Sequence, residues 1–431
     1  MVRTLFFWLK VFITQVLLFL YLYSIPLKGL PFGIGTRIVF SICGLLIVVF
    51  GLFSLRIKFN FISINRFLLS LLSFILLLVI TIYTSCFINS TNDTSLIRIS
   101  FSYLLTILSV YFFYRMISNL FPKRFFLSLL NMIVICSVIQ VSTALLMFVS
   151  PDFKELIISM IDPKDFLIEE ILLFSNFRLI GLGSNPFVTG FTNGFSLILL
   201  SFLIKKNQNR KLLMIYIVSF LLILVVGSMI ARTTMIGGFI SICNLMLWIK
   251  PVNKINLNKL VLNILMYSSL IFFLLIFIRS LDSGFVSKIN DSFEYGFEAL
   301  YNIKSGHGAQ TESTNELKEM YFFPEKLSTY MIGDGYYADP YNALSYYMHT
   351  DAGYIRLLYY IGLFGLSFYL AIQILPIGYV YFNSQEKHLK QFCLLLMIFF
   401  LLLMIKGVTD LFFLSYLIMY FFKESQKTTI K

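Results

Sequence analysis

The chain alternates long apolar stretches with short polar segments, and one long polar segment, residues 281–350, breaks this pattern. A run of about 20 apolar residues can cross the ~30 Å hydrocarbon core of a bilayer as an α-helix. The pattern predicts twelve such spans, at residues 5–24, 35–53, 67–88, 96–114, 125–149, 187–204, 212–229, 233–249, 260–279, 354–382, 391–405 and 411–422. Because two neighbouring pairs are joined by very short turns, counts of eleven and thirteen spans stay open.

The composition agrees with this pattern. Hydrophobic residues make up 58% of the 431 residues and charged residues only 13%, whereas a soluble domain carries about a quarter charged residues. All five cysteines lie in predicted spans without a CxxC pair, so we expect small core residues and neither a disulfide framework nor a zinc site. We therefore predict an all-α, polytopic helical integral membrane protein.

Lys and Arg residues are concentrated on one side of the predicted spans. If the N-terminus is cytoplasmic, more than half of the 34 Lys and Arg residues lie in both tails and in the short inner segments 54–66, 115–124, 205–211, 250–259 and 383–390. This positive-inside pattern places both termini in the cytoplasm. The net charge of +13 then reflects topology and anionic lipid head groups, and it does not indicate nucleic-acid binding.

The acidic residues lie on the opposite side. Of the 21 Asp and Glu residues, 6 fall in the external loop 150–186 and 11 fall in 281–351. Pro151 opens a short helical pattern in the first loop, and apolar residues at helical spacing between Phe285 and Leu300 predict an amphipathic helix in the second. Ser313 is expected to cap a further helix, which Pro324 would end. We interpret residues 1–431 as a single membrane domain with these two external elaborations, 150–186 and 281–350.

Three external patches are candidates for chemistry, and the first surrounds Arg178. Gly181, Gly183 and the Asn185-Pro186 dipeptide follow it at the entrance to a span. Glycines permit a tight backbone course and leave amide groups facing a cavity. The alternative is an Arg that reaches the membrane interface beside an ordinary turn.

The second patch is the turn Gly227–Gly238, which contains Arg232 between two spans. This Arg has almost no aqueous loop around it, and an ionisable residue at such a position costs roughly 2.5–3.5 kcal/mol even on lenient insertion scales. Such residues usually face a partner or a cavity. The alternative is contact with a lipid phosphate.

The third patch closes the long polar segment. Gly333-Asp334-Gly335 predicts a sharp turn, and five tyrosines follow, of which Tyr336, Tyr337 and Tyr347 are the candidates for stacking on sugar rings. Interfacial aromatic residues are the alternative. His349, Asp351 and Arg356 come next. On one helix, a separation of five residues does not pair Asp351 with Arg356, so each is expected to engage another group.

The order of these motifs resembles the O-antigen polymerase (Wzy) and O-antigen ligase superfamily over roughly residues 170–370. The resemblance rests on Arg-x-x-Gly with Asn-Pro at a span entrance, Ser with Arg-Thr in a hairpin turn, and a large external loop that closes on Gly-x-Gly, His/Asp and Gly-x-x-Gly. It implies a bacterial cytoplasmic-membrane glycosyltransferase with a GT-C-like fold, active at the periplasmic face. Its implied diphosphate-binding residues are Arg178, Arg232, Arg279 and Arg356.

The resemblance also implies the partners: undecaprenyl-diphosphate-linked glycans as donor and acceptor, membrane lipids, and a chain-length regulator protein. Asn185 joins the three tyrosines as a candidate sugar-binding residue. The ligase pattern places a His eleven residues before Gly-x-x-Gly. In this chain Asp351 stands eleven residues before Gly362, and His349 is two residues out of register. This departure favours the polymerase.

The expected chemistry needs few titratable groups. An anomeric carbon on a diphosphate already has a good leaving group, so arginines would stabilise the diphosphate, and Asp351 or His349 would act as the base for the attacking hydroxyl. No acidic pair lies beside the arginines, and we expect neither a metal nor another cofactor.

Three alternatives remain. An O-antigen ligase would transfer finished polymer to a lipid acceptor. A lipid-linked oligosaccharide flippase would have two similar halves and no long external loop, and the chain shows no internal repeat. A membrane O-acyltransferase would need a His in a span near an Arg, but the three histidines are His307, His349 and His388.

The charge pattern predicts the result of cysteine labelling in intact cells. Single cysteines placed in 150–186 or 281–350 should react with an impermeant reagent, because both loops are expected outside. Cysteines in 205–211 should not react. Labelling of 205–211 from outside would overturn the topology.

Overall fold

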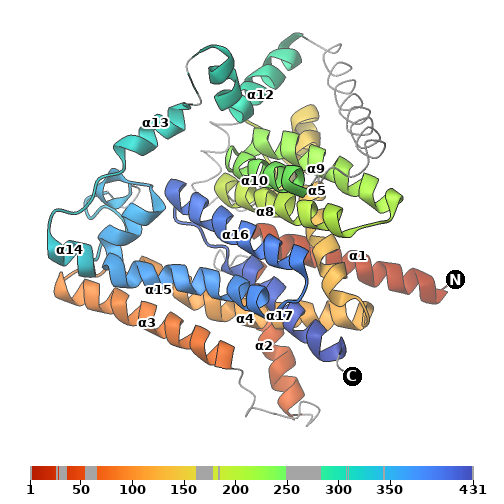
Figure 1. Cartoon of the computed structure of the whole chain (residues 1–431), viewed down its shortest axis with the longest axis horizontal. Coiled ribbons are helices and arrows are strands. Elements are labelled where there is room, and N and C mark those ends of the chain that lie inside the picture. Colours follow the sequence, from red (N-terminus) through yellow and green to blue (C-terminus); the bar gives the residue numbers. More distant parts are fainter. Residues whose placement is uncertain are drawn as a thin grey trace. The chain divides into compact units, whose positions relative to one another are not determined.

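The computed structural model describes residues 2–25, 28, 36–53, 66–161, 178–182, 185–248, 283–306, 308, 310–342 and 345–429. Its α-helices are α1 (Val2–Tyr23), α2 (Thr36–Phe53), α3 (Arg66–Ile88), α4 (Ser95–Leu120), α5 (Phe125–Val149), α6 (Pro151–Met160), α8 (Pro186–Lys206), α9 (Arg210–Ile230), α10 (Thr233–Trp248), α12 (Ser283–Lys304), α13 (Glu312–Glu319), α14 (Leu327–Ile332), α15 (Gly353–Asn383), α16 (Lys387–Lys406) and α17 (Phe412–Thr429). A 3₁₀ turn covers Tyr347–His349. Over the described residues the fold is all-α, with no strand (Figure 1).

The helices follow the predicted spans. Every predicted span except 260–279, which lies outside the described residues, coincides with a helix. Eight of the described helices are long and apolar enough to cross a membrane, namely α1, α3, α4, α5, α8, α9, α15 and α16. The apolar helices α2 and α10 are shorter. The structure thus supports a helical membrane protein, and the count of twelve spans stays a prediction.

Large apolar side chains cover outward-facing parts of the helices. Phe12 and Leu76 expose 66% and 60% of their surface, and Phe239 exposes 71%. Soluble monomers rarely leave extended apolar surfaces in water. In a bilayer these surfaces face lipid, and the helical backbone satisfies its own hydrogen bonds.

The chain divides into two compact units. Unit 1 comprises residues 1–14, 37–129 and 311–431, and unit 2 comprises 15–36 and 130–310. The boundary at 310/311 falls inside the long polar segment, so α12 belongs to unit 2, and α13 and α14 belong to unit 1.

In unit 1, α15 is the central helix. It packs against α3, α14, α16 and α17, and α4 packs against α3 and α17. A buried amide is paired inside this group: Gln373 donates to the Tyr103 hydroxyl at 3.0 Å and accepts from Leu411 N at 2.9 Å. Because burying an unpaired amide is costly, these bonds fix α15 against its neighbours.

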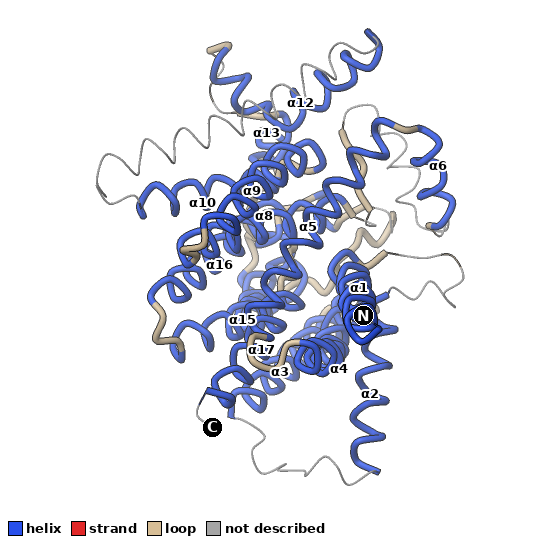
Figure 2. The backbone as a smooth tube through the Cα atoms, turned by 90° about the vertical axis from the view of Figure 1, so that its right-hand side faces the viewer, coloured by secondary structure: helices blue, strands red, loops and turns tan. Residues whose placement is uncertain are grey.

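In unit 2, α8 is buried along most of its length and packs against α9 and α10, which lie side by side with it in Figure 2. Buried hydroxyls link it to α5 through Ser137 and Ser196, whose oxygens are 2.7 Å apart. At the other end of α8, Lys205 donates to Asn244 at 2.6 Å. α12 packs against α9.

The elements of the long polar segment follow the sequence in part. The predicted amphipathic helix is α12, which has a kink at Phe297. The predicted cap at Ser313 is wrong, because Thr311 caps α13 and its side chain accepts from Thr314 N at 3.2 Å. The Thr314 side chain accepts from Thr311 N in return. Thr311, Ser313 and Thr314 all carry hydroxyls near this start, and the reciprocal bonds between Thr311 and Thr314 make Thr311 the cap.

Candidate functional site

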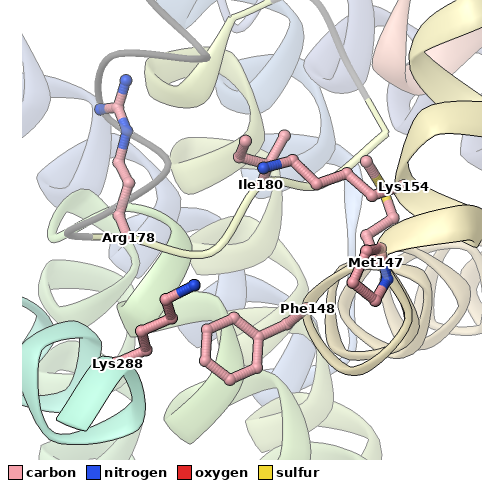
Figure 3. A pocket seen from close by; sticks show the side chains of 7 residues that line it. Met147, Phe148, Lys154, Arg178, Ile180 and Lys288 are labelled. Carbon is pink, nitrogen blue, oxygen red and sulfur yellow. The ribbon is translucent and has the colours of Figure 1, made fainter. Parts of the chain in front are cut away.

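A pocket in unit 2 brings three cations together. Its lining consists of Met147, Phe148, Pro151, Lys154, Arg178, Ile180 and Lys288, and its volume is ≈ 190 Å³. Figure 3 shows Lys154 and Lys288 reaching in from opposite sides, while the guanidinium of Arg178 points away from Lys288. Among the described residues that line it, none is acidic. We call this the cation pocket.

Each cation comes from a different segment. Lys154 lies in the first turns of α6, whose start is capped by Ser150, which accepts from Phe153 N at 3.3 Å. Arg178 precedes buried Leu179, which donates its N–H to Met229 O at 3.1 Å and so attaches this segment to the end of α9. Lys288 belongs to α12.

The positive charges of the pocket influence one another. Burial lowers the pKa of the Lys154 ammonium, and the charge of Lys288 lowers it further. An anion placed between Lys154 and Lys288 would oppose both effects, because a negative charge favours the charged form of each ammonium.

Arg232 has protein partners. Its Nη2 lies 2.6 Å from Glu298 Oε2, and its Nε donates to Tyr295 O at 3.0 Å. Its guanidinium also lies 4.2 Å from the centre of the Tyr295 ring. Only 19% of its side chain is exposed. The sequence predicted that Arg232 faces a partner or a cavity, and in the structure it contacts α12.

Arg356 is held in unit 1 between two aromatic rings. Its guanidinium carbon lies 3.7 Å from the Tyr337 ring centre and 3.6 Å from that of Tyr346. It also lies near Asp351, with Nη1 3.7 Å from Oδ1. The expectation that Asp351 and Arg356 do not pair is wrong. Helical spacing does not apply to them, because α15 begins only at Gly353 and Asp351 precedes it.

Asp351 combines a negative charge with partial burial. Burial raises the pKa of its carboxyl to about 6, and the positive charges of Arg356 and Lys406 oppose this rise. The Asp351 carboxylate is therefore largely ionised at neutral pH, and it becomes protonated as the pH falls through about 6.

The loop that leads to Asp351 is fastened by the turn between α3 and α4. Asp93 Oδ2 accepts from Tyr337 N at 2.7 Å and from Ala338 N at 3.1 Å. Asn89 donates to Gly333 O, and Thr91 donates to Gly335 O, both at 2.8 Å. Both segments are external on the predicted topology, and their contact agrees with this.

The glycine motifs of this region allow backbone to pack on backbone. Gly333 and Gly362 have φ of +88° and +64°. A Cβ at Gly333 would overlap the Tyr360 carbonyl, and one at Gly362 would overlap the Met331 carbonyl. The Gly-x-Gly and Gly-x-x-Gly motifs thus join the loop to α15, as glycine allows at positive φ.

The other predicted residues have mixed positions. His349 is exposed and has a left-handed backbone, with φ of +53°, a conformation that is uncommon and costly for a non-glycine residue. The rings of Tyr336 and Tyr347 stack with centres 5.3 Å apart, and the Tyr347 hydroxyl donates to Asp334 at 3.2 Å. Tyr337 packs inward on Arg356.

Asn185 caps α8, since its side chain accepts from Phe187 N at 2.8 Å. Gly183 and Arg279 lie outside the described residues. Among the residues that are described, no three His, Cys, Asp or Glu side chains are grouped to hold a metal ion.

Four residues of these sites were missed from the sequence: Asp93, Lys154, Lys288 and Glu298. Each of them has a bonding partner or a pocket neighbour more than 60 positions away in the chain. Sequence spacing therefore gave no sign of these interactions. For Lys288, the amphipathic pattern predicted the helix but gave no sign of the pocket beneath it.

No family model, curated protein or solved structure matches this chain.

The Asp93 bonds predict how firmly the loop is held. Hydrogen bonds from Ser95, Ala338 and Tyr337 outweigh burial and lower the pKa of Asp93. The carboxylate therefore stays ionised at neutral pH, and its contribution to loop docking is lost only in acid, as pH falls through this lowered pKa.

Asp93→Ala should weaken loop docking by about 1–3 kcal/mol. Chymotrypsin should then cleave at the loop tyrosines faster in purified protein. Asp339→Ala, which removes only local bonds to Tyr341 N and Asn342 N, should change cleavage little. Equal rates for the two variants would contradict the anchoring role.

Proposed function

We propose that this chain polymerises polyprenyl-diphosphate-linked oligosaccharide repeat units, as an O-antigen polymerase does. The observation that carries the proposal is the cation pocket, which Lys154, Arg178 and Lys288 line together and whose described lining residues include no acid. A diphosphate is the common anionic group of such lipid-linked donors. Arginine forks and lysine charges both pair with phosphate oxygens.

The setting of the pocket supports a lipid-linked substrate. Its walls include the end of α5 and the start of α6, directly after a helix that is long and apolar enough to span a membrane. A diphosphate on a polyprenyl chain lies at the same level, where hydrocarbon meets water. The proposal includes a GT-C-like fold with twelve spans, cytoplasmic termini and a periplasmic site in the bacterial cytoplasmic membrane.

The reaction is a substitution at the anomeric carbon. The hydroxyl oxygen of the acceptor sugar forms a bond to C1 of the donor while the bond from C1 to the diphosphate oxygen breaks. Asp351 takes the hydroxyl proton, and the polyprenyl diphosphate leaves with the electron pair of the broken bond. Positive charge stabilises a departing diphosphate, and the cation pocket of unit 2 is proposed to bind the diphosphate of a lipid-linked repeat unit. Arg356, stacked between its tyrosines, keeps a positive charge beside Asp351.

A ligase remains the second candidate. Its pattern requires a catalytic His, and His349 is two residues from that position. Asp351 stands at that position in the sequence and is the base of this proposal, which favours the polymerase.

The glycan that accumulates in cells tests the function. Deleting the gene should leave a single undecaprenyl-linked repeat unit outside the membrane. Full-length polymer on the carrier would indicate a ligase, and repeat units trapped inside would indicate a flippase.

The same assay tests the pocket. Lys154→Gln or Lys288→Gln removes one charge-assisted bond to the diphosphate and should slow repeat joining roughly 10- to 100-fold. Lys318→Gln, on the exposed face of α13, is the matched control and should join repeats normally. Normal polymer from both pocket variants would refute the role of the pocket.

The base assignment is tested with two substitutions and a pH profile. Asp351→Asn keeps the shape but loses the base, so chain extension should fall by ~10²-fold or more, while His349→Ala should be milder. Because a raised pKa means protonation at higher pH, extension by the unmodified protein should decline as pH falls through about 6. The opposite ranking of the two variants would make His349 the base and favour the ligase.

A further inference from the structure

The surroundings of Arg232 differ from those of an arginine that binds a ligand. It stands in the turn directly after α9, and its Nε, its Nη2 and one face of its guanidinium all meet α12. These contacts occupy most of the groups with which an arginine grips a phosphate. Its role therefore has to be sought through α12.

α12 is docked on the end of α9 over a close backbone contact. A Cβ added at Gly296 would lie 3.0 Å from the Ser228 carbonyl and 3.1 Å from Met229 N, so only glycine fits this approach well. Ser292, one turn earlier on the same face, is 1% exposed. Arg232 then adds its bond to Tyr295 O and its ion pair with Glu298 on either side of the kink at Phe297.

The docked face of α12 is also the face that carries Lys288. Residues 288, 292 and 295 are spaced four and three apart, so their side chains lie along one side of the helix. Ser292 is buried and the Tyr295 ring lies against Arg232, whereas Lys288, two turns before Tyr295, lines the cation pocket. Met229 also accepts the bond that holds the Arg178 segment. The end of α9 thus locates two of the three cations.

We infer that Arg232 is a positioning residue: with Glu298 and Tyr295 it holds α12 in place, and α12 holds Lys288 at the pocket. The inference rests on the proposed function only in taking a diphosphate as the ligand of the pocket. Lys288 repels Lys154, so the docking contacts work against this repulsion. A bound anion removes the repulsion, and docking of α12 and anion binding therefore reinforce each other.

Arg232→Ala does not separate positioning from direct contact, because both predict a loss of activity. Two other variants do. Glu298→Gln removes the ion pair and leaves Arg232 in place. Gly296→Val disturbs the backbone contact and changes no charge. If Arg232 gripped the diphosphate directly, the first change would free it and binding would tighten or stay equal, and the second would have no effect.

The experiment uses the full chain in lipid nanodiscs, with inorganic pyrophosphate as the probe. Positioning predicts that each variant weakens pyrophosphate binding by at least about fivefold, the lower end of typical coupling between sites. It also predicts amide hydrogen exchange in α12 that is about 5- to 30-fold faster, as expected for the loss of a partly buried contact, and exchange that pyrophosphate slows in the unmodified protein. Glu294→Gln, an exposed carboxylate on the same helix, is the control and should match the unmodified protein.

Unchanged or tighter pyrophosphate binding by Glu298→Gln and Gly296→Val would overturn the inference. Arg232 would then be assigned to direct binding of the diphosphate. Absence of pyrophosphate binding to the unmodified protein would instead count against the proposed function. Exchange in α12 would then decide the docking role by itself: faster exchange in both variants supports it, and unchanged exchange refutes it.

Discussion

A charged group at the end of an apolar helix needs a partner, and the polar segments of this chain are organised by the partners that such groups find. Arg232 pairs with Glu298 and thereby fixes α12. Arg356 lies between two tyrosine rings and beside Asp351. Asp93 receives two backbone N–H groups of the loop. In each case the desolvation cost at the membrane boundary is offset by attaching a distant polar segment to a helix end.

This requirement separates two kinds of cation. The arginines that are conspicuous in the sequence because they sit at span ends, Arg232 and Arg356, have only 19% and 8% of their side chains exposed and are engaged by the protein. The two lysines of the cation pocket lie in polar segments, where a lysine is common and does not by itself indicate a site. For Arg232 and Arg356 the desolvation cost is met by partners within the fold, whereas Arg178 and two lysines line the pocket. An Arg near a membrane therefore indicates architecture at least as strongly as it indicates substrate.

Features that depend on local interactions could be predicted from the sequence, and features that depend on long-range contacts could not. Apolar runs predicted the helices, and the amphipathic pattern predicted α12, because both signals are local. Gly333 and Gly335 indicated a turn, and both have positive φ. The pairing of Asp351 with Arg356 was misjudged because helical spacing was applied to a residue that precedes the helix. Lys154, Lys288 and Glu298 were missed since their partners are distant in the chain, and a single sequence carries no record of such contacts.

On the proposed function, the charge of the pocket suits the transition state better than the donor. In the donor the diphosphate is linked to carbon at both ends, and as the bond to the sugar breaks its terminal oxygen gains negative charge. Three cations held by separate segments, with no acid among the described lining residues, would interact more strongly with this developing charge than with the intact donor. Such differential binding lowers a barrier. The same preference holds the departing polyprenyl diphosphate most tightly of all. Docking of α12 therefore bears on product release as well as on the reaction, since an anion that stabilises the docked helix can leave only as that stabilisation is given up.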